Sequence, residues 1–157
     1  MAKNDFDFLF GEWTVRNRRL AAILAGSDEW YEFGATCSVR PLWGGLGNSD
    51  EFVALETPVG PILGGAVRLL DPKNGLWRIY WASSATGELG APVVGGFDGG
   101  VGTFYGHEVY REHGVFVRYT WDSIEAGACR WQQAFSADAG ASWETNWVME
   151  FSRRMQA

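Results

Sequence analysis

Histidine, cysteine and methionine are scarce in this chain, and their scarcity removes several kinds of site. The 157 residues include 2 histidines, 2 cysteines and 3 methionines. Cys37 and Cys129 lie far apart without C-x-x-C spacing, and neither His107 nor His113 stands in a ligand-type motif. Metal sites draw on clusters of such residues, so we expect no metal. The cysteines are typical of small buried residues in a reduced cytoplasm, with a single disulfide as the alternative.

Basic residues are in the minority too. The chain has 13 Lys and Arg against 19 Asp and Glu, a formal net charge of −6. Binding to nucleic acid needs an excess of positive charge on one face, so nucleic acid is not an expected partner. No apolar run is long enough to cross a bilayer. The opening "MAKNDFDFLFGEW" carries aspartates where a signal peptide would be apolar, which favours a cytoplasmic location.

Familiar catalytic motifs are missing as well. "GGLGNSDE", residues 44–51, has neither the lysine of a phosphate-binding loop nor G-x-G-x-x-G spacing. No G-x-S-x-G elbow occurs. Asp50 and Glu51 are adjacent in an expected strand, so they point to opposite faces and do not form a catalytic pair. The residues therefore support a fold and a pocket but name no reaction.

One motif is present, but only once. Residues 136–143, "SADAGASW", fit the pattern S-x-D-x-G-x-[ST]-W and resemble the Asp-box turn of sialidase propellers. A propeller repeats its motif and needs at least about four four-stranded blades, more than this length supplies. We interpret the motif as a hairpin turn. Asp138 accepts backbone hydrogen bonds, Gly140 takes a positive φ, and the Trp143 ring enters the core.

Glycine and aromatic residues are abundant, with 21 Gly, 9 Trp, 10 Phe and 5 Tyr. Aromatic and β-branched runs between glycine-rich turns are typical of antiparallel sheet. The pattern predicts one all-β domain over residues 1–157. About ten strands in serial hairpins follow a short N-terminal helical turn capped by Asn4 or Asp5. Because a sheet of that many strands closes or splits, we expect a closed antiparallel up-and-down β-barrel, with a two-sheet sandwich as the alternative.

Alternation along the strands predicts which side chains face the interior. The inward sets are Trp13, Val15, Asn17 and Arg19; Trp77, Ile79 and Trp81; Val115, Val117, Tyr119 and Trp121; Trp131, Gln133 and Phe135; and Trp143, Thr145, Trp147, Met149 and Phe151. Polar groups among so many aromatic rings need partners, and an apolar cavity with a few polar groups is the usual form of a small-ligand site. The alternative is a barrel filled by its own side chains.

Gly11-Glu12-Trp13, placed after a helical turn at the first strand, resembles the G-x-W signature of the calycin superfamily. That superfamily includes lipocalins, fatty-acid-binding proteins and nitrobindin-like haem barrels. Four segments together are similar to an uncharacterised bacterial family of calycin-like proteins, a domain of unknown function: "FDFLFGEWTVRNRRL", "GGLGNSDEF", "WRIYW" and "RWQQAFSADAGASWETNWVMEFSR". The resemblance implies a barrel with a pocket for a small hydrophobic or amphipathic molecule, and it brings no catalytic residues. Trp13 is expected to plug one end.

Haem is the cofactor that the resemblance raises. Nitrobindin-like barrels bind haem through a histidine on a late strand, and residues from 114 onward contain none. His107 lies one strand earlier and can face inward with Tyr105. A lone histidine there is more typical of a wall or rim residue, so we expect no cofactor and keep haem binding as an alternative.

Three arginines, Arg68, Arg118 and Arg130, stand mid-strand among apolar neighbours. The aromatic alternation in their strands points away from them, so we expect them on the outer wall, paired with glutamates across strands. The alternative is an inward cluster that grips a carboxylate.

The predicted function is binding of a small hydrophobic or amphipathic molecule. The expected lining is Trp81, Tyr119, Trp121, Trp131 and Trp147, with Asn17, Arg19, Gln133 and Thr145 orienting the ligand and Tyr105 and His107 also in the site. A cofactor-free cyclase or isomerase on the same scaffold is the alternative, since shape and a few hydrogen bonds suffice for such chemistry. A filled barrel that acts as an interaction module is the third, and outer-wall aromatics such as Phe116 and Tyr80 allow a homodimer.

Overall fold

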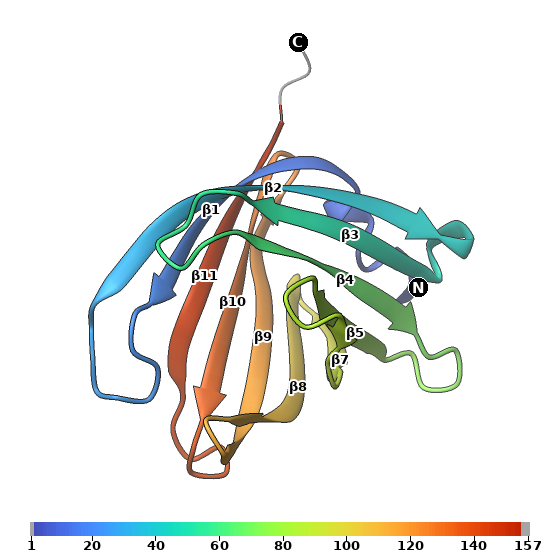
Figure 1. Ribbon diagram of the computed structural model, residues 1–157. Helices are drawn as coiled ribbons and strands as arrows, with labels where there is room; N and C mark the ends of the chain where they lie inside the picture. Colours follow the sequence, from blue (N-terminus) through green and yellow to red (C-terminus); the bar gives the residue numbers. More distant parts are fainter. Residues whose placement is uncertain (1, 155–157) are drawn as a thin grey trace.

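Two 3₁₀ turns open the chain and eleven strands follow (Figure 1). The computed structural model describes residues 2–154. The turns are η1 (Ala2–Asn4) and η2 (Asp7–Leu9). The strands are β1 (Gly11–Leu20), β2 (Trp30–Leu42), β3 (Gly47–Ala54), β4 (Ile62–Leu70), β5 (Trp77–Ser83), β6 (Glu88–Leu89), β7 (Val93–Asp98), β8 (Val101–Tyr110), β9 (His113–Glu125), β10 (Ala128–Ser136) and β11 (Glu144–Arg153), with η3 (Trp43–Gly45) between β2 and β3. None of the described helices is long and apolar enough to span a membrane.

The strands close into an antiparallel barrel, and the first and last strands meet. β1 pairs with β2 on one side and with β11 on the other. From β11 the order runs β10, β9, β8, β7 and β5, and a β4–β5 pairing completes the ring of ten strands, with the two-residue β6 beside β5. The predicted up-and-down barrel is confirmed and the sandwich is wrong. Closure leaves none of the long strands with an unpaired edge.

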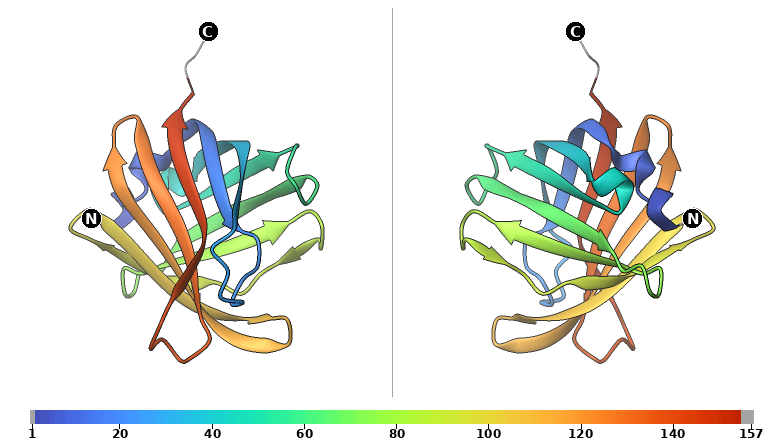
Figure 2. Two further views of the ribbon diagram at one scale, coloured as in Figure 1. Left: turned by 90° about the vertical axis from the view of Figure 1, so that its left-hand side faces the viewer. Right: turned by 90° about the vertical axis from the view of Figure 1, so that its right-hand side faces the viewer.

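The N-terminal turns close one end of the barrel (Figure 2). Phe6 and Leu9 are fully buried, and the Phe6 ring lies with its centroid 4.9 Å from that of Trp77. The expected cap by Asn4 or Asp5 is wrong, because η2 begins after Phe6 without a side-chain hydrogen bond. Asp5 instead accepts a hydrogen bond of 3.1 Å from the Trp77 indole. The carboxylate thus ties the plug to the barrel wall.

Trp13 and Arg153 fasten this closed end. Trp13 is fully buried, as predicted, and its indole donates to the Leu9 carbonyl at 2.7 Å. The Arg153 guanidinium lies 4.3 Å from the centroid of the Trp13 ring and donates to the carbonyls of Phe8 and Phe10. Gly11 has φ +118, where a Cβ would lie 2.8 Å from an Arg153 nitrogen. The G-x-W sequence needs its glycine chiefly because L side chains rarely adopt this positive φ.

A β-bulge in β11 reverses the predicted alternation over the first part of that strand. Gln133 of β10 pairs with Trp147, but the next residue, Ala134, pairs with Thr145, so Asn146 is the extra residue. Trp147, Met149 and Phe151 face inward as predicted. Thr145 shares the outer face with Ala134, and Asn146 is fully buried. The prediction of an inward Thr145 is wrong because a bulge shifts the two-residue period by one.

The Asp-box segment forms the predicted turn. Asp138 accepts hydrogen bonds from the Ser142 amide and the Ser136 hydroxyl, each 2.8 Å long, and Gly140 has φ +90. The Ser142 hydroxyl donates to the other Asp138 oxygen, and this bond, followed by those from the Ser142 amide and the Ser136 hydroxyl, lowers the pKa of Asp138 to about 2. The ring of Trp143, however, does not enter the core. It lies outside the barrel, with the Arg118 guanidinium 4.5 Å from its centroid.

Candidate functional site

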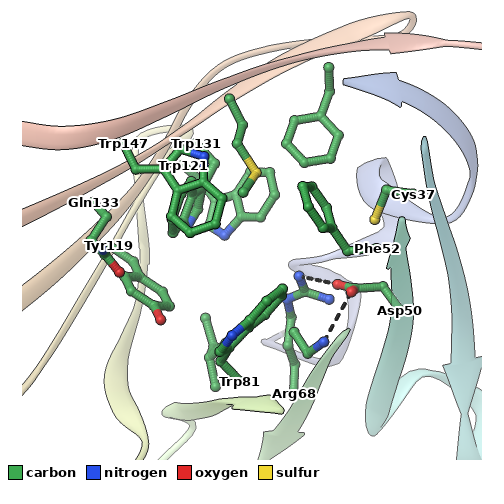
Figure 3. A pocket seen from close by; sticks show the side chains of 14 residues that line it. Cys37, Asp50, Phe52, Arg68, Trp81, Tyr119, Trp121, Trp131, Gln133 and Trp147 are labelled. Carbon is green, nitrogen blue, oxygen red and sulfur yellow. Dashed lines mark hydrogen bonds and ion pairs between the residues drawn. The ribbon is translucent and has the colours of Figure 1, made fainter. Parts of the chain in front are cut away.

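A cavity of about 80 Å³ lies in the barrel interior (Figure 3). Seven aromatic side chains line it: Phe52, Trp81, Tyr119, Trp121, Trp131, Trp147 and Phe151. The remaining lining is aliphatic or polar, from Cys37, Asp50, Ala66, Arg68, Ile79, Gln133 and Met149. A single water needs roughly 10–15 Å³, so the interior is not a solid core. The predicted lining of four tryptophans and Tyr119 is brought together in full.

The aromatic rings meet edge to face. Trp131 stands nearly perpendicular to both Tyr119 and Trp147, with centroids 5.0 and 5.7 Å apart. Phe52 meets Trp81 in the same way, at 5.9 Å. Edge-to-face contacts hold rings apart at fixed angles. They therefore stabilise this arrangement of the lining.

The cavity reaches solvent on the side away from the N-terminal plug. Trp81, Tyr119 and Gln133 are half-buried lining residues, and Figure 3 shows Tyr119 and Gln133 together on one side of the cavity. Gly64 of β4 sets the position of Trp81. A Cβ at Gly64 would lie 2.6 Å from the Trp81 ring and 2.5 Å from the Ala82 carbonyl oxygen. The missing side chain lets the indole lie directly against β4.

Arg68 faces the interior, which corrects the prediction of an outer-wall position. Its side chain is only 6% exposed and forms an ion pair of 2.7 Å with Asp50, which is 4% exposed. A second guanidinium nitrogen donates to Asn48 at 2.8 Å. The other Asp50 oxygen accepts the Ala66 amide at 3.0 Å. The inner end of the cavity thus carries a charged pair whose net charge is zero.

The outer-wall prediction holds for the other two arginines. Arg130 lies opposite Asp122 of β9 and forms two hydrogen bonds with its carboxylate, at 2.8 and 3.1 Å. The partner is an aspartate and not a glutamate. Arg118 covers the Trp143 ring outside the barrel. The inward cluster of three arginines does not form.

Four buried side-chain nitrogens lack a hydrogen-bond partner within residues 2–154: Asn48 Nδ2, Arg68 Nε, Trp121 Nε1 and Asn146 Nδ2. Each of them is an N–H donor. Two belong to lining residues, Arg68 and Trp121, and the Arg68 Cζ atom lies 5.7 Å from the Trp121 ring centroid. The inner end of the cavity therefore offers donors and few free acceptors.

Burial keeps two lining groups, the Cys37 thiol and the Tyr119 phenol, in their neutral forms. Burial, helped by the Asp50 charge, raises the pKa of the Cys37 thiol well above its usual value. Burial and the nearby Glu108 carboxylate likewise raise the pKa of the Tyr119 phenol. Both side chains are hydrogen-bond donors at neutral pH, and neither is a nucleophile there. Both cysteines are free thiols, so the disulfide alternative is wrong.

Asn17 and Arg19 stand behind the lining and do not touch the cavity. Asn17 is fully buried, and its side-chain oxygen accepts a hydrogen bond of 2.9 Å from the Trp147 indole. The Arg19 guanidinium lies 4.3 Å from the centroid of the same indole. Both residues hold Trp147 in place. Gln133 does line the cavity and donates to Asn146 at 2.8 Å.

Tyr105 and His107 lie outside the barrel, contrary to the prediction. Phe104 of β8 is fully buried, so the odd-numbered residues beside it point outward, and Tyr105 is 52% exposed. His107 pairs with Phe116, which is itself an exposed outer-wall residue. Neither residue contributes to the cavity. Haem ligation by His107 inside the barrel is therefore wrong.

Asp50 and the inward position of Arg68 are the charged features of the site that sequence reasoning missed. The sequence analysis considered Asp50 only in rejecting a catalytic pair with Glu51, since adjacent residues in a strand point apart, and the structure agrees, with Glu51 exposed. The usable signal was an acid and a base, each mid-strand, on neighbouring strands of an antiparallel meander. Buried charges are found in pairs, so either one alone should have prompted a search for the other.

The closed ten-stranded ring and its aromatic cavity define a calycin-like barrel. No protein-family model matches the chain, and no curated protein matches its sequence. Among solved structures, the S-type phycobiliprotein lyase CPES from Guillardia theta is similar, with a TM-score of 0.62 and 11% identity over 97% of this chain and 92% of the lyase.

Two engineered barrels are also similar. A redesigned β-barrel aligns with a TM-score of 0.53 and 8% identity over 97% of this chain and 96% of that one. A de novo designed fluorescence-activating β-barrel aligns with a TM-score of 0.50 and 14% identity over 98% of this chain and all of the design. At such low identities the likeness establishes the fold alone.

Proposed function

We propose that this protein binds a small, largely apolar molecule in the barrel cavity, which the ligand enters past Trp81, Tyr119 and Gln133. The observation that carries the proposal is room inside an aromatic-lined barrel that the N-terminal turns plug at one end. The room is about half of the roughly 150 Å³ that holds benzene in an engineered protein core. A ring-sized ligand would therefore extend from the inner end toward solvent.

The structural neighbours support this proposal at the level of fold. A barrel designed to activate fluorescence and a phycobiliprotein lyase share the architecture, although neither shares enough sequence to transfer a ligand. The cyclase or isomerase alternative gains no comparable support. Asp50 and Arg68 are already paired with each other, and the Cys37 and Tyr119 pKa values are shifted away from neutrality.

Filling the cavity tests the proposal. Ala66 lines the cavity, so Ala66→Leu places three more carbons in it, whereas Ala128 lies on the outer face of β10 beside Ser152. We expect ethylbenzene to shift the indole N–H signals of the lining tryptophans saturably in NMR spectra of the wild type and of Ala128→Leu. Ala66→Leu should show no saturable shift. Equal binding by Ala66→Leu, or no binding by the wild type, would contradict a ligand in this cavity.

A further inference from the structure

We propose that the inner end of the cavity receives the carbonyl oxygen of a neutral ligand, held by the Trp121 Nε1–H and Arg68 Nε–H groups. This inference rests on the proposed binding function and specifies the class of ligand. It would make the protein a receptor for small apolar ketones, lactones or amides. The inner polar cluster, which we define as Asn48, Asp50, Arg68 and Trp121, carries the inference.

The first step is the imbalance between donors and acceptors in this cluster. Trp121 is 2% exposed and Arg68 is 5% exposed, and each has a nitrogen without a partner in the described part of the protein. A buried donor without an acceptor has lost its hydrogen bonds to water without replacement, which is unfavourable. A ligand that carries an acceptor to this point removes that cost. A hydrocarbon that fills the same space does not.

The second step is charge. The Arg68 cation is already paired with the Asp50 anion at 2.7 Å, inside an interior where both side chains are almost fully covered. A carboxylate ligand would bring a second negative charge against Asp50 without a second cation. An uncompensated buried charge is far more costly than a buried neutral dipole. The cluster therefore favours a neutral acceptor.

The third step is geometry. The Arg68 guanidinium lies against Trp121, with Cζ 5.7 Å from the ring centroid, so the two side chains are neighbours at the same end of the cavity. A carbonyl oxygen has two lone pairs and accepts two hydrogen bonds at once. The adjoining room of about 80 Å³ is suited to a small head group. The apolar remainder of the ligand would lie among Trp81, Tyr119 and Trp147.

Three single-ring probes separate the contributions: acetophenone, which carries a neutral carbonyl; ethylbenzene, which has nearly the same shape without an acceptor; and benzoate, which is charged. Dissociation constants are measured by NMR titration of the indole N–H signals, with the Trp121 signal identified by its loss in Trp121→Phe. We expect acetophenone to bind about five- to tenfold more tightly than ethylbenzene, the size of one or two net hydrogen bonds. The Trp121 N–H signal should move downfield with acetophenone, and benzoate should bind most weakly.

The matched variants are Trp121→Phe and Trp147→Phe. Both remove an indole from the lining, but the Trp147 N–H is already bonded to Asn17. Trp121→Phe should lower the ketone-to-hydrocarbon preference by about fivefold, the size of one hydrogen bond, whereas Trp147→Phe should weaken both probes alike.

Four results would overturn the inference. Equal binding of acetophenone and ethylbenzene means that water already satisfies the donors. A preference that survives Trp121→Phe places the carbonyl elsewhere. Tighter binding of benzoate means that the site prefers an anion and that Arg68 can leave Asp50 to pair with it. Failure of every probe would overturn the proposed binding function as well, whereas ethylbenzene binding without a ketone preference overturns this inference alone.

Discussion

Arg68 places a positive charge in the barrel interior, where its side chain is almost fully buried. Its charge is balanced by Asp50, and its position is fixed by Asn48 and by the rings of Phe6 and Trp121. Such a pair contributes little net stability compared with apolar packing, but removal of one partner leaves the other as an uncompensated buried charge, which is strongly destabilising. The pair orients donors within an otherwise aromatic wall. It thereby gives the cavity a polar end and an apolar end.

The pair should show strong coupling between its two members. Arg68→Met leaves Asp50 charged and buried, and we expect it to lower the free energy of unfolding by about 3–5 kcal/mol. Arg68→Met combined with Asp50→Asn leaves no charge, while the amide oxygen still accepts the Ala66 N–H, so the double variant should be more stable than Arg68→Met alone. Urea unfolding followed by tryptophan fluorescence measures both. A double variant as unstable as the sum of its single changes would mean that the charges do not interact.

At the residue scale, the sequence predicted the apolar part of the site and not its polar end. The inward orientation of Trp81, Trp131 and Trp147 follows from the alternation along their strands, because the apolar residues of a strand with one buried face point toward the core. For Arg68 the same alternation predicts an outward position, and that prediction is wrong. The missing information was a long-range pairing: β3 and β4 place Arg68 directly opposite Asn48 and beside Asp50. A single sequence does not specify which strand registers bring two charges together.

At the scale of a strand, one extra residue in β11 decides that Trp147 faces the barrel interior while Trp143 lies on the outer wall. Asn146 forms the bulge and bonds to Gln133 of β10. Beyond it, Thr145 faces outward, and Trp143 packs on Arg118 and Tyr105 of the outer wall. The inward prediction for Trp143 and Thr145 was wrong for this reason. A bulge cannot be recognised reliably from the amino-acid sequence. A prediction of inward and outward side chains that assumes strict alternation is therefore reversed for the residues beyond the bulge.

Two tryptophan substitutions distinguish the outer wall from the core. Trp143→Ala removes a ring that stacks on Arg118, and we expect a loss of about 1 kcal/mol in the free energy of unfolding. Trp13→Ala removes a fully buried ring and should cost about 3–5 kcal/mol. Chemical denaturation of both variants gives the comparison. A Trp143→Ala variant as unstable as Trp13→Ala would place that ring inside the barrel after all.

At the scale of the molecule, the barrel is closed by unequal seams. β1 and β11 are joined by seven residue pairs, from Trp13↔Arg153 to Arg19↔Trp147. β5 and β7 share only three, from Trp77↔Gly95 to Ile79↔Val93, and β6 with its flanking loops fills the rest of that side. The half-buried Trp81 stands at the end of this short seam. The overall closure was predictable from the number of strands, but the weak seam was not.

Hydrogen exchange should reveal that inequality. Short ladders open at lower free energy than long ones, so the amides of residues 84–92 and of β7 should exchange before those of β1 and β11. Exchange measured by NMR or by mass spectrometry of peptides reports the order directly. The same experiment with a bound probe should slow exchange beside Trp81. Faster exchange at the β1–β11 seam than at β5–β7 would show that the barrel opens elsewhere.

The last described residues lie at the plugged end, where the Arg154 amide donates to the Glu12 carbonyl at 3.0 Å and Arg153 donates to the Phe10 carbonyl just before β1. Figure 1 shows β11 ending on that side of the barrel. Because β11 ends on the pole opposite to Trp81, an affinity handle attached through the C-terminus would hold the protein on a sensor chip by the pole away from its entrance. Surface-attached copies would present their entrance to the bulk phase, so captured protein and free protein should give the same equilibrium response to a diffusing analyte.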